Sequence, residues 1–337
     1  MTPARAGLRS ATAAGLAALA VAVFGFPQPF LAVLASQLVV SQARGGGRFL
    51  GCNLWAVGIG AFSGVGALTL CAQEPWLLLP VGGIVAGIGG ASWWGSRGPV
   101  AAMVFLMGLV APMGSGLIYP EGAVINGFAH AGSLILALLA AAVARALFGL
   151  DADEQIANEE IAAYPLAVSK TAFGLLSGLS VLAGFGTSAL LLPGFVVPLS
   201  ISVVAACCSF GSMPVPGVIR QKIWGAILGG VIATVFVILV AGAGNDLAVL
   251  VGGLVVVLGT LEAMARRSVS AAGCYRQAAA IFAVAATMLP APLAHLSGVL
   301  LRVVSVWVGF ALALLVGLAL LHFGRKHPDL NPDRRAG

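Results

Sequence analysis

The segment DADEQIANEEIAAY, from Asp151 to Tyr164, divides the chain into two apolar halves. It holds five of the eleven acidic residues and is the only strongly polar run between the two termini. Charged side chains are costly to place in hydrocarbon, so we expect a soluble hinge between membrane-embedded parts. The sequence therefore predicts a first membrane repeat at 1–150, an acidic cytoplasmic hinge at 151–164, a second membrane repeat at 165–324 and a charged cytoplasmic tail at 325–337.

Both halves have the composition of a membrane protein. Of the 337 residues, 60% are hydrophobic and 8% are charged, and the mean hydropathy is +1.06. Soluble domains carry about 25% charged residues, and a helix needs about 20 apolar residues to cross the hydrocarbon. Apolar runs of that kind recur along the chain without the alternation typical of transmembrane strands. We therefore expect an all-α integral membrane protein.

Twelve transmembrane helices are predicted, six before the hinge and six after it. Each is an apolar run between charged residues and proline or glycine breaks. The second and eleventh runs are short enough to be re-entrant, so a count of ten or eleven stays open. The predicted spans are Leu8 to Phe26, Phe30 to Gln42, Phe49 to Ala72, Trp76 to Gly95, Pro99 to Leu117, Ala123 to Phe148, Leu166 to Leu190, Gly194 to Phe210, Ile223 to Gly242, Leu247 to Met264, Ala278 to Leu289 and Leu296 to Phe323.

Basic residues give this topology its orientation. With the N-terminus inside, almost every lysine and arginine falls at a cytoplasmic end, as the positive-inside rule requires, and Arg302 is the one out of place. The basic residues occur singly or in pairs, without the basic stripe of a nucleic-acid-binding protein. We therefore expect a multi-pass protein in contact with lipid, with both termini in the cytoplasm and no nucleic-acid partner.

An internal repeat relates the two halves. The decapeptides VGGIVAGIGG, from Val81, and VGGLVVVLGT, from Val251, share five identities at an offset of 170 residues. Because each half has an even number of helices, the two repeats are predicted to be parallel, as in transporters with two similar halves. Pairs of glycines four residues apart predict close helix packing, since small residues let backbones approach. These pairs begin at Gly60, Gly83, Gly174 and Gly225.

Ionisable residues near the ends of the predicted spans are the candidate site. Glu121 and His130 begin the sixth span from its outer side, and His295 and Arg302 lie at the same end of the twelfth. An ionisable group near hydrocarbon marks a functional position by default. Arg302 suits an anionic substrate, and Glu121 or His130 suits proton coupling. The alternative for each is an interfacial residue that meets water or lipid headgroups.

Other polar and aromatic residues are expected to have structural roles. Arg145 is predicted to reach the cytoplasmic interface, Glu262 to pair with Arg266 and Arg267 on its own helix, and Trp94 to lie in an interfacial aromatic belt. The five cysteines lack metal-ligand spacing, and no catalytic or nucleotide-binding motif is present. We therefore expect no enzyme activity, no cofactor and no metal.

Four motifs near the N-terminus carry a family resemblance. They are Leu8-Arg9, Phe26-Pro27 with Pro29-Phe30-Leu31-Ala32-Val33-Leu34, Val39-Val40-Ser41-Gln42, and Arg48-Phe49-Leu50-Gly51. Together they are similar to the fusaric acid resistance (FUSC-like) and aromatic acid exporter superfamily. In that family a basic first helix leads to an aromatic-Trp-Ala-Val-Leu segment, a Gln-containing turn and an Arg-x-x-Gly-Thr helix start. Two departures are that Leu31 stands where a Trp is common, and that the hinge replaces a large cytoplasmic region.

The resemblance implies efflux of aromatic or other weak organic acids through the bacterial inner membrane, often with a periplasmic adaptor protein. Since the chain has no ATP-binding motif, we expect a secondary efflux transporter for a small-molecule substrate. A passive channel or uptake permease, and a membrane assembly subunit that does not transport, are the alternatives. Whether the chain forms a homo-oligomer stays open.

Overall fold

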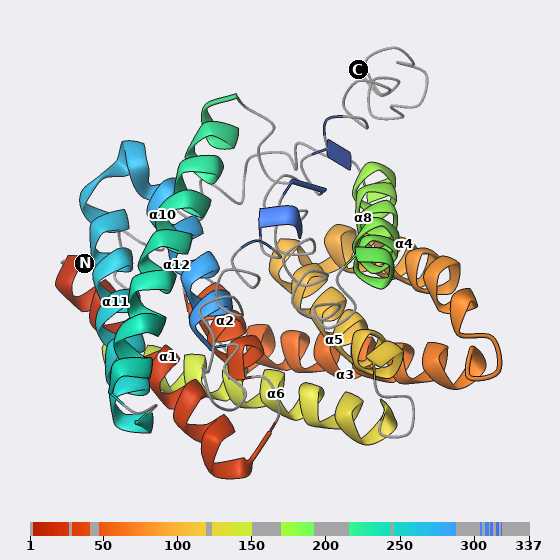
Figure 1. Cartoon of the computed structure of the whole chain (residues 1–337), viewed down its shortest axis with the longest axis horizontal. Helices are drawn as coiled ribbons and strands as arrows, with labels where there is room; N and C mark the ends of the chain where they lie inside the picture. The colour runs from red at the N-terminus through yellow and green to blue at the C-terminus, as the bar shows by residue number, and fades with distance from the viewer. Residues whose placement is uncertain are drawn as a thin grey trace. The chain divides into compact units, whose positions relative to one another are not determined.

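The structure is a computed structural model. It describes residues 3–26, 29–40, 47–118, 123–149, 170–191, 216–243 and 246–287, with scattered positions between 304 and 318. All regular secondary structure in these ranges is helical (Figure 1). The predicted hinge and the predicted span Gly194 to Phe210 lie outside the described residues, as does most of the last predicted span.

Ten α-helices and two short 3-10 helices make up the described ranges. They are α1 (Pro3–Phe24), α2 (Pro29–Val40), α3 (Gly47–Leu70), η1 (Pro75–Leu77), α4 (Leu78–Arg97), α5 (Pro99–Ile118), α6 (Ala123–Phe148), α8 (Lys170–Leu191), α10 (Pro216–Gly242), α11 (Leu247–Arg267), η4 (Val269–Ala271) and α12 (Ala272–Thr287).

Seven helices in the described ranges are long and apolar enough to cross a membrane. The expectation of an all-α protein with several spans is confirmed at that level, and the number twelve stays a prediction. The second predicted span is the 12-residue α2. At 1.5 Å per residue it extends over about 18 Å, which is less than the roughly 30 Å of hydrocarbon.

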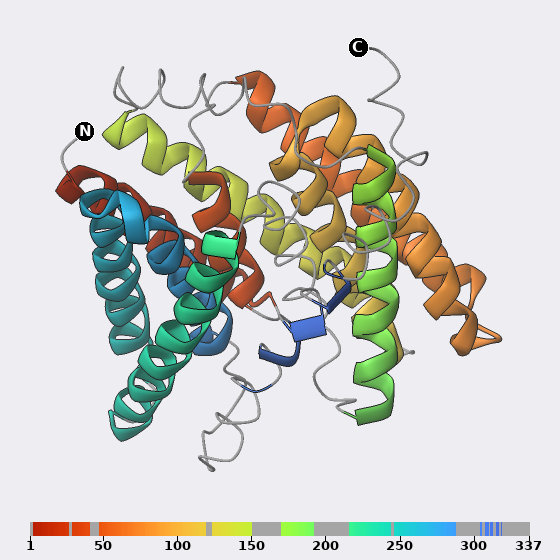
Figure 2. The same ribbon diagram turned by 90° about the horizontal axis from the view of Figure 1, so that it is seen from above.

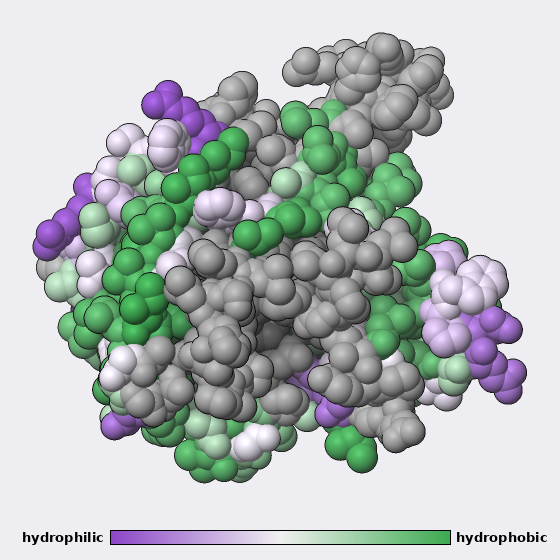
Figure 3. Space-filling model, in the orientation of Figure 1, coloured by the Kyte–Doolittle hydropathy of each residue, from purple (hydrophilic) through white to green (hydrophobic). Residues whose placement is uncertain are grey.

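The outer surface of the helices is apolar. On α10, Trp224, Val231, Val235 and Leu239 are each more than half exposed. Figure 3 shows a continuous hydrophobic surface over this helix, with hydrophilic residues near the turn between α3 and α4. Large exposed apolar areas are unusual on a soluble monomer, whereas lipid-facing surfaces consist of them. The surface therefore agrees with a membrane environment.

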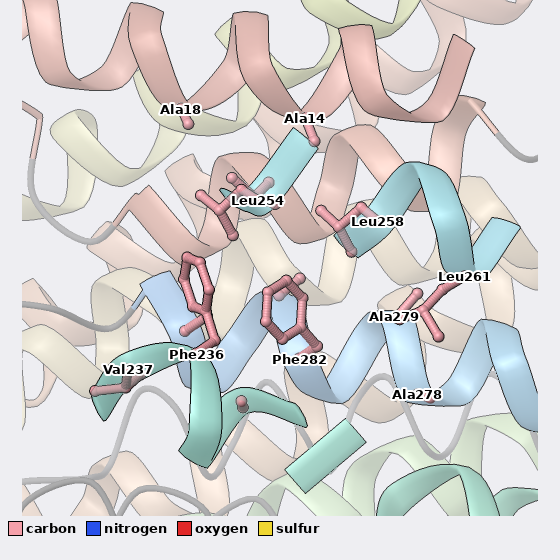
Figure 4. Close-up of a cluster of buried hydrophobic side chains, with 14 of the residues drawn as sticks. Ala14, Ala18, Phe236, Val237, Leu254, Leu258, Leu261, Ala278, Ala279 and Phe282 are labelled. Carbon is pink, nitrogen blue, oxygen red and sulfur yellow. The ribbon is translucent and has the colours of Figure 1, made fainter. Parts of the chain in front are cut away.

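One compact unit, here called unit 1, combines residues 1–54, 129–164 and 215–306. In it α1 packs on α2 and α11, and α12 packs on α2, α10 and α11. Both ribbon views show α1 beside α11 (Figures 1 and 2). Phe236 and Phe282 meet edge to face with their ring centroids 5.2 Å apart. Leu254, Leu258 and Ala14 complete the apolar core around them (Figure 4).

The other compact unit, unit 2, combines residues 55–128, 165–214 and 307–337. In it α4 packs on α5 and α8, and α3 packs on α5. A methyl group added at Gly64 of α3 would lie 2.5 Å from the Leu109 carbonyl oxygen of α5. Pro112 lies inside α5 and packs against Gly64 and Gly127. Glycines thus allow α3 and α6 to approach α5 at its proline.

Neither unit coincides with one half of the sequence. Unit 1 takes α1 and α2 from before the hinge and α10, α11 and α12 from after it. Unit 2 takes most of α3, all of α4 and α5 from before the hinge, and α8 from after it. The helices α3 and α6 each contribute residues to both units. The predicted division at 1–150 and 165–324 is a division of the sequence and stays a prediction.

The glycine pairs predicted to pack closely lie at helix crossings, which confirms that prediction. The pairs at Gly83 and Gly174 face each other. A methyl group at Gly174 would lie 2.8 Å from the Gly87 carbonyl oxygen, and one at Gly178 would lie 2.6 Å from that of Gly83. The pair at Gly60 packs against carbonyl groups of α5, and the pair at Gly225 packs against carbonyl groups of α12. Each crossing therefore brings two backbones into direct contact.

Candidate functional site

Of the four predicted site residues, the described part of the chain includes His130. It lies on α6 in unit 1 and is 1% exposed. Glu121, His295 and Arg302 lie outside the described residues, so the proposed pairing of Glu121 with His130 stays a prediction. Within the same ranges, no group of three or more His, Cys, Asp or Glu side chains could hold a metal ion.

The buried charged, histidine and amide side chains of the described residues all belong to unit 1. They are Arg9, Asn53, His130, Glu262 and Gln277. The buried polar side chains of unit 2 are serines. Burying a charge in an apolar interior is costly unless it is paired and hydrogen-bonded. The chemistry that the described residues can offer is therefore concentrated in unit 1.

Two arginines of unit 1 bind carbonyl groups of distant helices. Arg9 Nη1, on α1, donates a hydrogen bond of 3.0 Å to the carbonyl oxygen of Gly149, directly after α6. Arg145 Nη2, on α6, donates a hydrogen bond of 2.6 Å to the carbonyl oxygen of Val39 in the last turn of α2. The last carbonyl groups of a helix have no partner within it, and a cation there is favoured by the helix dipole.

A glutamine closes this set of bonds into a ring. Gln37 Nε2, on α2, donates a hydrogen bond of 2.9 Å to the carbonyl oxygen of Ser10 on α1, and the Ser10 hydroxyl group contacts Gln37 Oε1. The bonds now run from α1 to α6, from α6 to α2 and from α2 back to α1. We call the four side chains of Arg9, Ser10, Gln37 and Arg145 the polar ring.

Local sequence explains why α6 ends within reach of Arg9. Gly149 has a φ of +65°, which is the left-handed conformation that commonly terminates helices. Its N–H group donates a hydrogen bond of 2.7 Å to the carbonyl oxygen of Arg145. The chain therefore turns at Gly149 and presents its carbonyl group to α1.

Arg145 does not reach the interface in the way predicted from its position. Its guanidinium group bonds to α2 and lies over the ring of Phe49 on α3, with its central carbon 5.4 Å from the ring centroid. A cation over an aromatic face is attracted by the ring quadrupole. The side chain of Arg145 is thus used to join helices inside unit 1.

An unsatisfied amide oxygen lies one helical turn beyond Phe49. Asn53 is 1% exposed, and its Nδ2 atom donates a hydrogen bond of 2.8 Å to the carbonyl oxygen of Phe49. Its Oδ1 atom is buried and accepts no hydrogen bond from any residue that the structure describes. A buried acceptor without a partner costs about 1–3 kcal/mol, so this oxygen is available to a donor.

Glu262 forms a second charged cluster in unit 1. Its Oε1 atom lies 3.0 Å from Arg266 Nε, one turn along α11, which confirms the predicted pair. Its Oε2 atom lies 3.8 Å from Arg276 Nε on α12, a link between helices that the sequence did not indicate. Because the Arg276 side chain is 45% exposed, we expect the bond within α11 to contribute more.

Replacing Glu262 with glutamine is expected to lower the free energy of unfolding by about 2 kcal/mol, since it removes a charged partner of a hydrogen bond in a mostly buried place. Unfolding of the purified protein in detergent measures the change. Glu74→Gln is the matched control, because Glu74 is exposed and accepts a hydrogen bond from Trp76 next to it in the same turn. Equal stability of the two variants would mean that Glu262 does not join the helices.

Trp94 does not lie in an interfacial belt as predicted. It is 1% exposed, and its ring stacks on Phe173 of α8 with the centroids 3.9 Å apart. The two aromatic rings fill the contact between α4 and α8 in unit 2. Sequence reasoning placed Trp94 at the interface because it lies near the end of a span, but the position of α8 covers it.

The chain matches no protein-family model, no curated protein and no solved structure. The resemblance to the aromatic acid exporter superfamily therefore rests on the N-terminal motifs alone.

Proposed function

We propose that the chain is a secondary transporter that exports small organic acids across the bacterial inner membrane, built from two six-helix repeats that exchange helices. The observation that carries the proposal is the equivalence of two helix crossings, one in each unit. The crossing of α1 on α11 in unit 1 corresponds to the crossing of α8 on α4 in unit 2.

The first helices of the two halves are equivalent in length and contact. Both α1 and α8 have 22 residues, and they begin and end 167 residues apart. A methyl group at Gly7 would lie 2.6 Å from the carbonyl oxygen of Gly259, and one at Gly174 would lie 2.8 Å from that of Gly87. Gly7 and Gly174 are related by the same offset of 167, while Gly87 and Gly259 are 172 residues apart.

The next turn of each crossing repeats these offsets with the large and small residues exchanged. Gly15 of α1 packs against Val255 of α11, and Gly83 of α4 packs against Leu182 of α8. Gly15 and Leu182 are again 167 residues apart, and Gly83 and Val255 are again 172 apart. A small residue faces a large one in both crossings, so the helices can approach equally closely.

A second pair of crossings agrees with this relation. Gly60 of α3 packs against the carbonyl oxygen of Phe105 in α5, and Gly229 of α10 packs against that of Ala278 in α12. Gly60 and Gly229 are 169 residues apart, as are the first residues of α3 and α10. Phe105 and Ala278 are 173 apart, as are the first residues of α5 and α12. The offset thus grows along the chain.

The contacts place α4 and α11 in a register that differs from the predicted one. The two decapeptides align at 170, whereas the contacts give 172. At 172, Glu74 corresponds to Asp246, and these acids are the N-caps of η1 and α11. The side chain of Asp246 accepts a hydrogen bond from the Ala248 N–H group. The contacts and the caps support the repeat, and the similarity of the decapeptides is shifted by two residues.

Transport follows from this architecture by analogy. Each unit would hold the first two helices of one repeat and the third to fifth of the other, and transporters built from two repeats work by moving such bundles against each other. Organic acids are the expected cargo because of the N-terminal motifs and because the polar ring offers two guanidinium groups, which bind carboxylates well.

Cells that contain the chain are expected to accumulate less radiolabelled benzoate than cells without it. Collapsing the proton gradient should abolish the difference, since secondary export needs an ion gradient. The experiment compares accumulation in both strains with and without an uncoupler. The absence of any difference for a panel of aromatic and aliphatic acids would contradict the proposal. Downhill flux that ignores the uncoupler would indicate a passive channel instead.

A further inference from the structure

We propose that the polar ring is the carboxylate site of this exporter, and that the bound carboxylate replaces the carbonyl groups of Gly149 and Val39 as the partner of Arg9 and Arg145. Binding would then release α6 from α1 and α2, because these two hydrogen bonds join the three helices. The inference rests on the proposed function, since it assigns residues to the same substrate.

The repeat provides an internal control for Arg9. At the offset of 167, Arg9 corresponds to Leu176 and Ser10 corresponds to Ser177 of α8. Leu176 is 4% exposed and Ser177 is 1% exposed, so both positions are buried in unit 2 as they are in unit 1. Ser177 donates to the Phe173 carbonyl oxygen of its own helix. A leucine therefore suffices for this crossing, and packing does not require the cation at Arg9.

Other buried polar residues of unit 1 correspond to apolar ones in the same way. Glu262 corresponds to Gly90 at the offset of 172, and Gln277 corresponds to Val104 at 173. Gly90 and Val104 are buried. The shared fold is thus satisfied by apolar side chains at these positions. The polar residues of unit 1 are additions to it, and additions of costly buried charge mark function.

The chemistry of the ring selects a carboxylate. A carbonyl group accepts a guanidinium proton but carries no charge, whereas a carboxylate accepts two parallel hydrogen bonds and neutralises the cation. Charge pairs are stronger in an apolar interior than in water, and Arg9 is 1% exposed. A carboxylate that enters the ring therefore competes well with the two carbonyl groups.

Neighbouring residues favour an aromatic acid over a phosphate. The Phe49 ring lies against Arg145 and offers an apolar face to a second ring. Asn53, one turn further along α3, offers the buried Oδ1 atom that accepts no hydrogen bond within the described residues, and a ligand hydroxyl group could donate to it. Inorganic phosphate has no apolar surface to place against Phe49.

Binding of radiolabelled benzoate to the purified full-length protein in detergent tests the assignment. Arg9→Leu, which introduces the residue of the equivalent position, is expected to weaken benzoate binding about ten- to a hundred-fold, as for loss of a charged hydrogen-bond partner. Arg97→Leu is the matched control, because Arg97 is an exposed arginine at the end of α4. It is expected to bind benzoate as the wild type does.

Neutral and inorganic competitors separate recognition of charge from loss of structure. Benzyl alcohol binding should be almost unchanged in Arg9→Leu, and a parallel loss of both ligands would overturn the assignment. Arg9→Lys, which keeps the charge and the fold, should retain part of the benzoate affinity. Displacement of benzoate by inorganic phosphate or by phosphatidylglycerol at lower concentrations than by unlabelled benzoate would also overturn it.

The failure of this inference is distinguishable from failure of the proposed function. If wild-type protein exports benzoate and Arg9→Leu exports it equally well, the site assignment is wrong and the exporter remains. If the wild-type protein neither binds nor exports any carboxylate, both are wrong.

Discussion

Leucine in place of Gly259 is expected to leave little folded protein, whereas leucine in place of Gly252 on the same helix is expected to have almost no effect. A methyl group at Gly259 would lie 3.0 Å from the Cβ atom of Ala11 and 3.1 Å from the carbonyl oxygen of Gly7. A methyl group at Gly252 would meet nothing within 4 Å. The two glycines therefore differ in their surroundings although both lie on α11.

The size of the effect follows from the stiffness of the neighbours. Inserting extra methylene groups into a packed interior typically costs about 1–3 kcal/mol, and leucine adds a whole branched side chain against backbone that cannot rotate away. We therefore expect about 3 kcal/mol or more at Gly259. The yield of monodisperse protein from size-exclusion chromatography and the midpoint of thermal unfolding in detergent measure it.

Gly87 repeats this test in unit 2. Its neighbours are the Gly174 carbonyl oxygen and the Cα atom of Gly178, so Gly87→Leu should be as damaging as Gly259→Leu. If Gly252→Leu proved as harmful as either, leucine would be acting through the helix itself and not through the crossing.

The positions of most helices could be predicted from the sequence. The bounds of α6 are those of the predicted span, Ala123 to Phe148, because a proline and an acidic residue precede it and a glycine follows it. The start of α1 was predicted at Leu8, but the helix begins at Pro3. Arg5 and Arg9 were interpreted as flanking charges, yet both lie within the helix.

The pairing of the helices could not be predicted. An apolar side chain that faces lipid and one that faces another helix look the same in a hydropathy pattern, so the sequence does not say that α1 packs on α11. Small residues also match one another in several registers, which is why the decapeptides suggested 170 and the contacts give 172. The glycine pairs identified the contact faces but not their partners.

The candidate site was also beyond the reach of sequence motifs. In the polar ring, three of the acceptors are backbone carbonyl groups, of Gly149, Val39 and Ser10, and a carbonyl group leaves no signature in a sequence. Arg9 and Arg145 were interpreted as topology determinants because they lie near the ends of spans. Only the positions of three helix ends relative to one another show that these two arginines act together.

Two fragments of the chain, residues 1–150 and 165–337, are expected to form a stable complex when they are expressed together and to be degraded when each is expressed alone. Each fragment would lack the partner of its first helix, because α1 packs on α11 and α8 packs on α4. The glycine faces of these helices would then meet lipid or the wrong helix. Co-purification of an untagged fragment with a tagged one measures the complex.

A disulfide bond between the fragments makes the same experiment specific for the exchanged pairing. The Cβ atom of Ala11 lies 3.0 Å from a Cβ atom placed at Gly259, close to the roughly 3.5–4.5 Å that a disulfide spans. Ala11→Cys with Gly259→Cys, in a chain whose five native cysteines are replaced, should therefore join the two fragments on oxidation. The control pair, Ala11→Cys with Gly252→Cys, should not.

The outcome decides between two ways of building the membrane part. If each half folds by itself, both fragments will be stable alone, will not co-purify, and will show no disulfide between Ala11→Cys and Gly259→Cys. If the halves exchange helices, neither fragment can complete a unit without the other, and the bond will form only in the complex. Because the bond joins two separate polypeptides, no movement within one half can produce it.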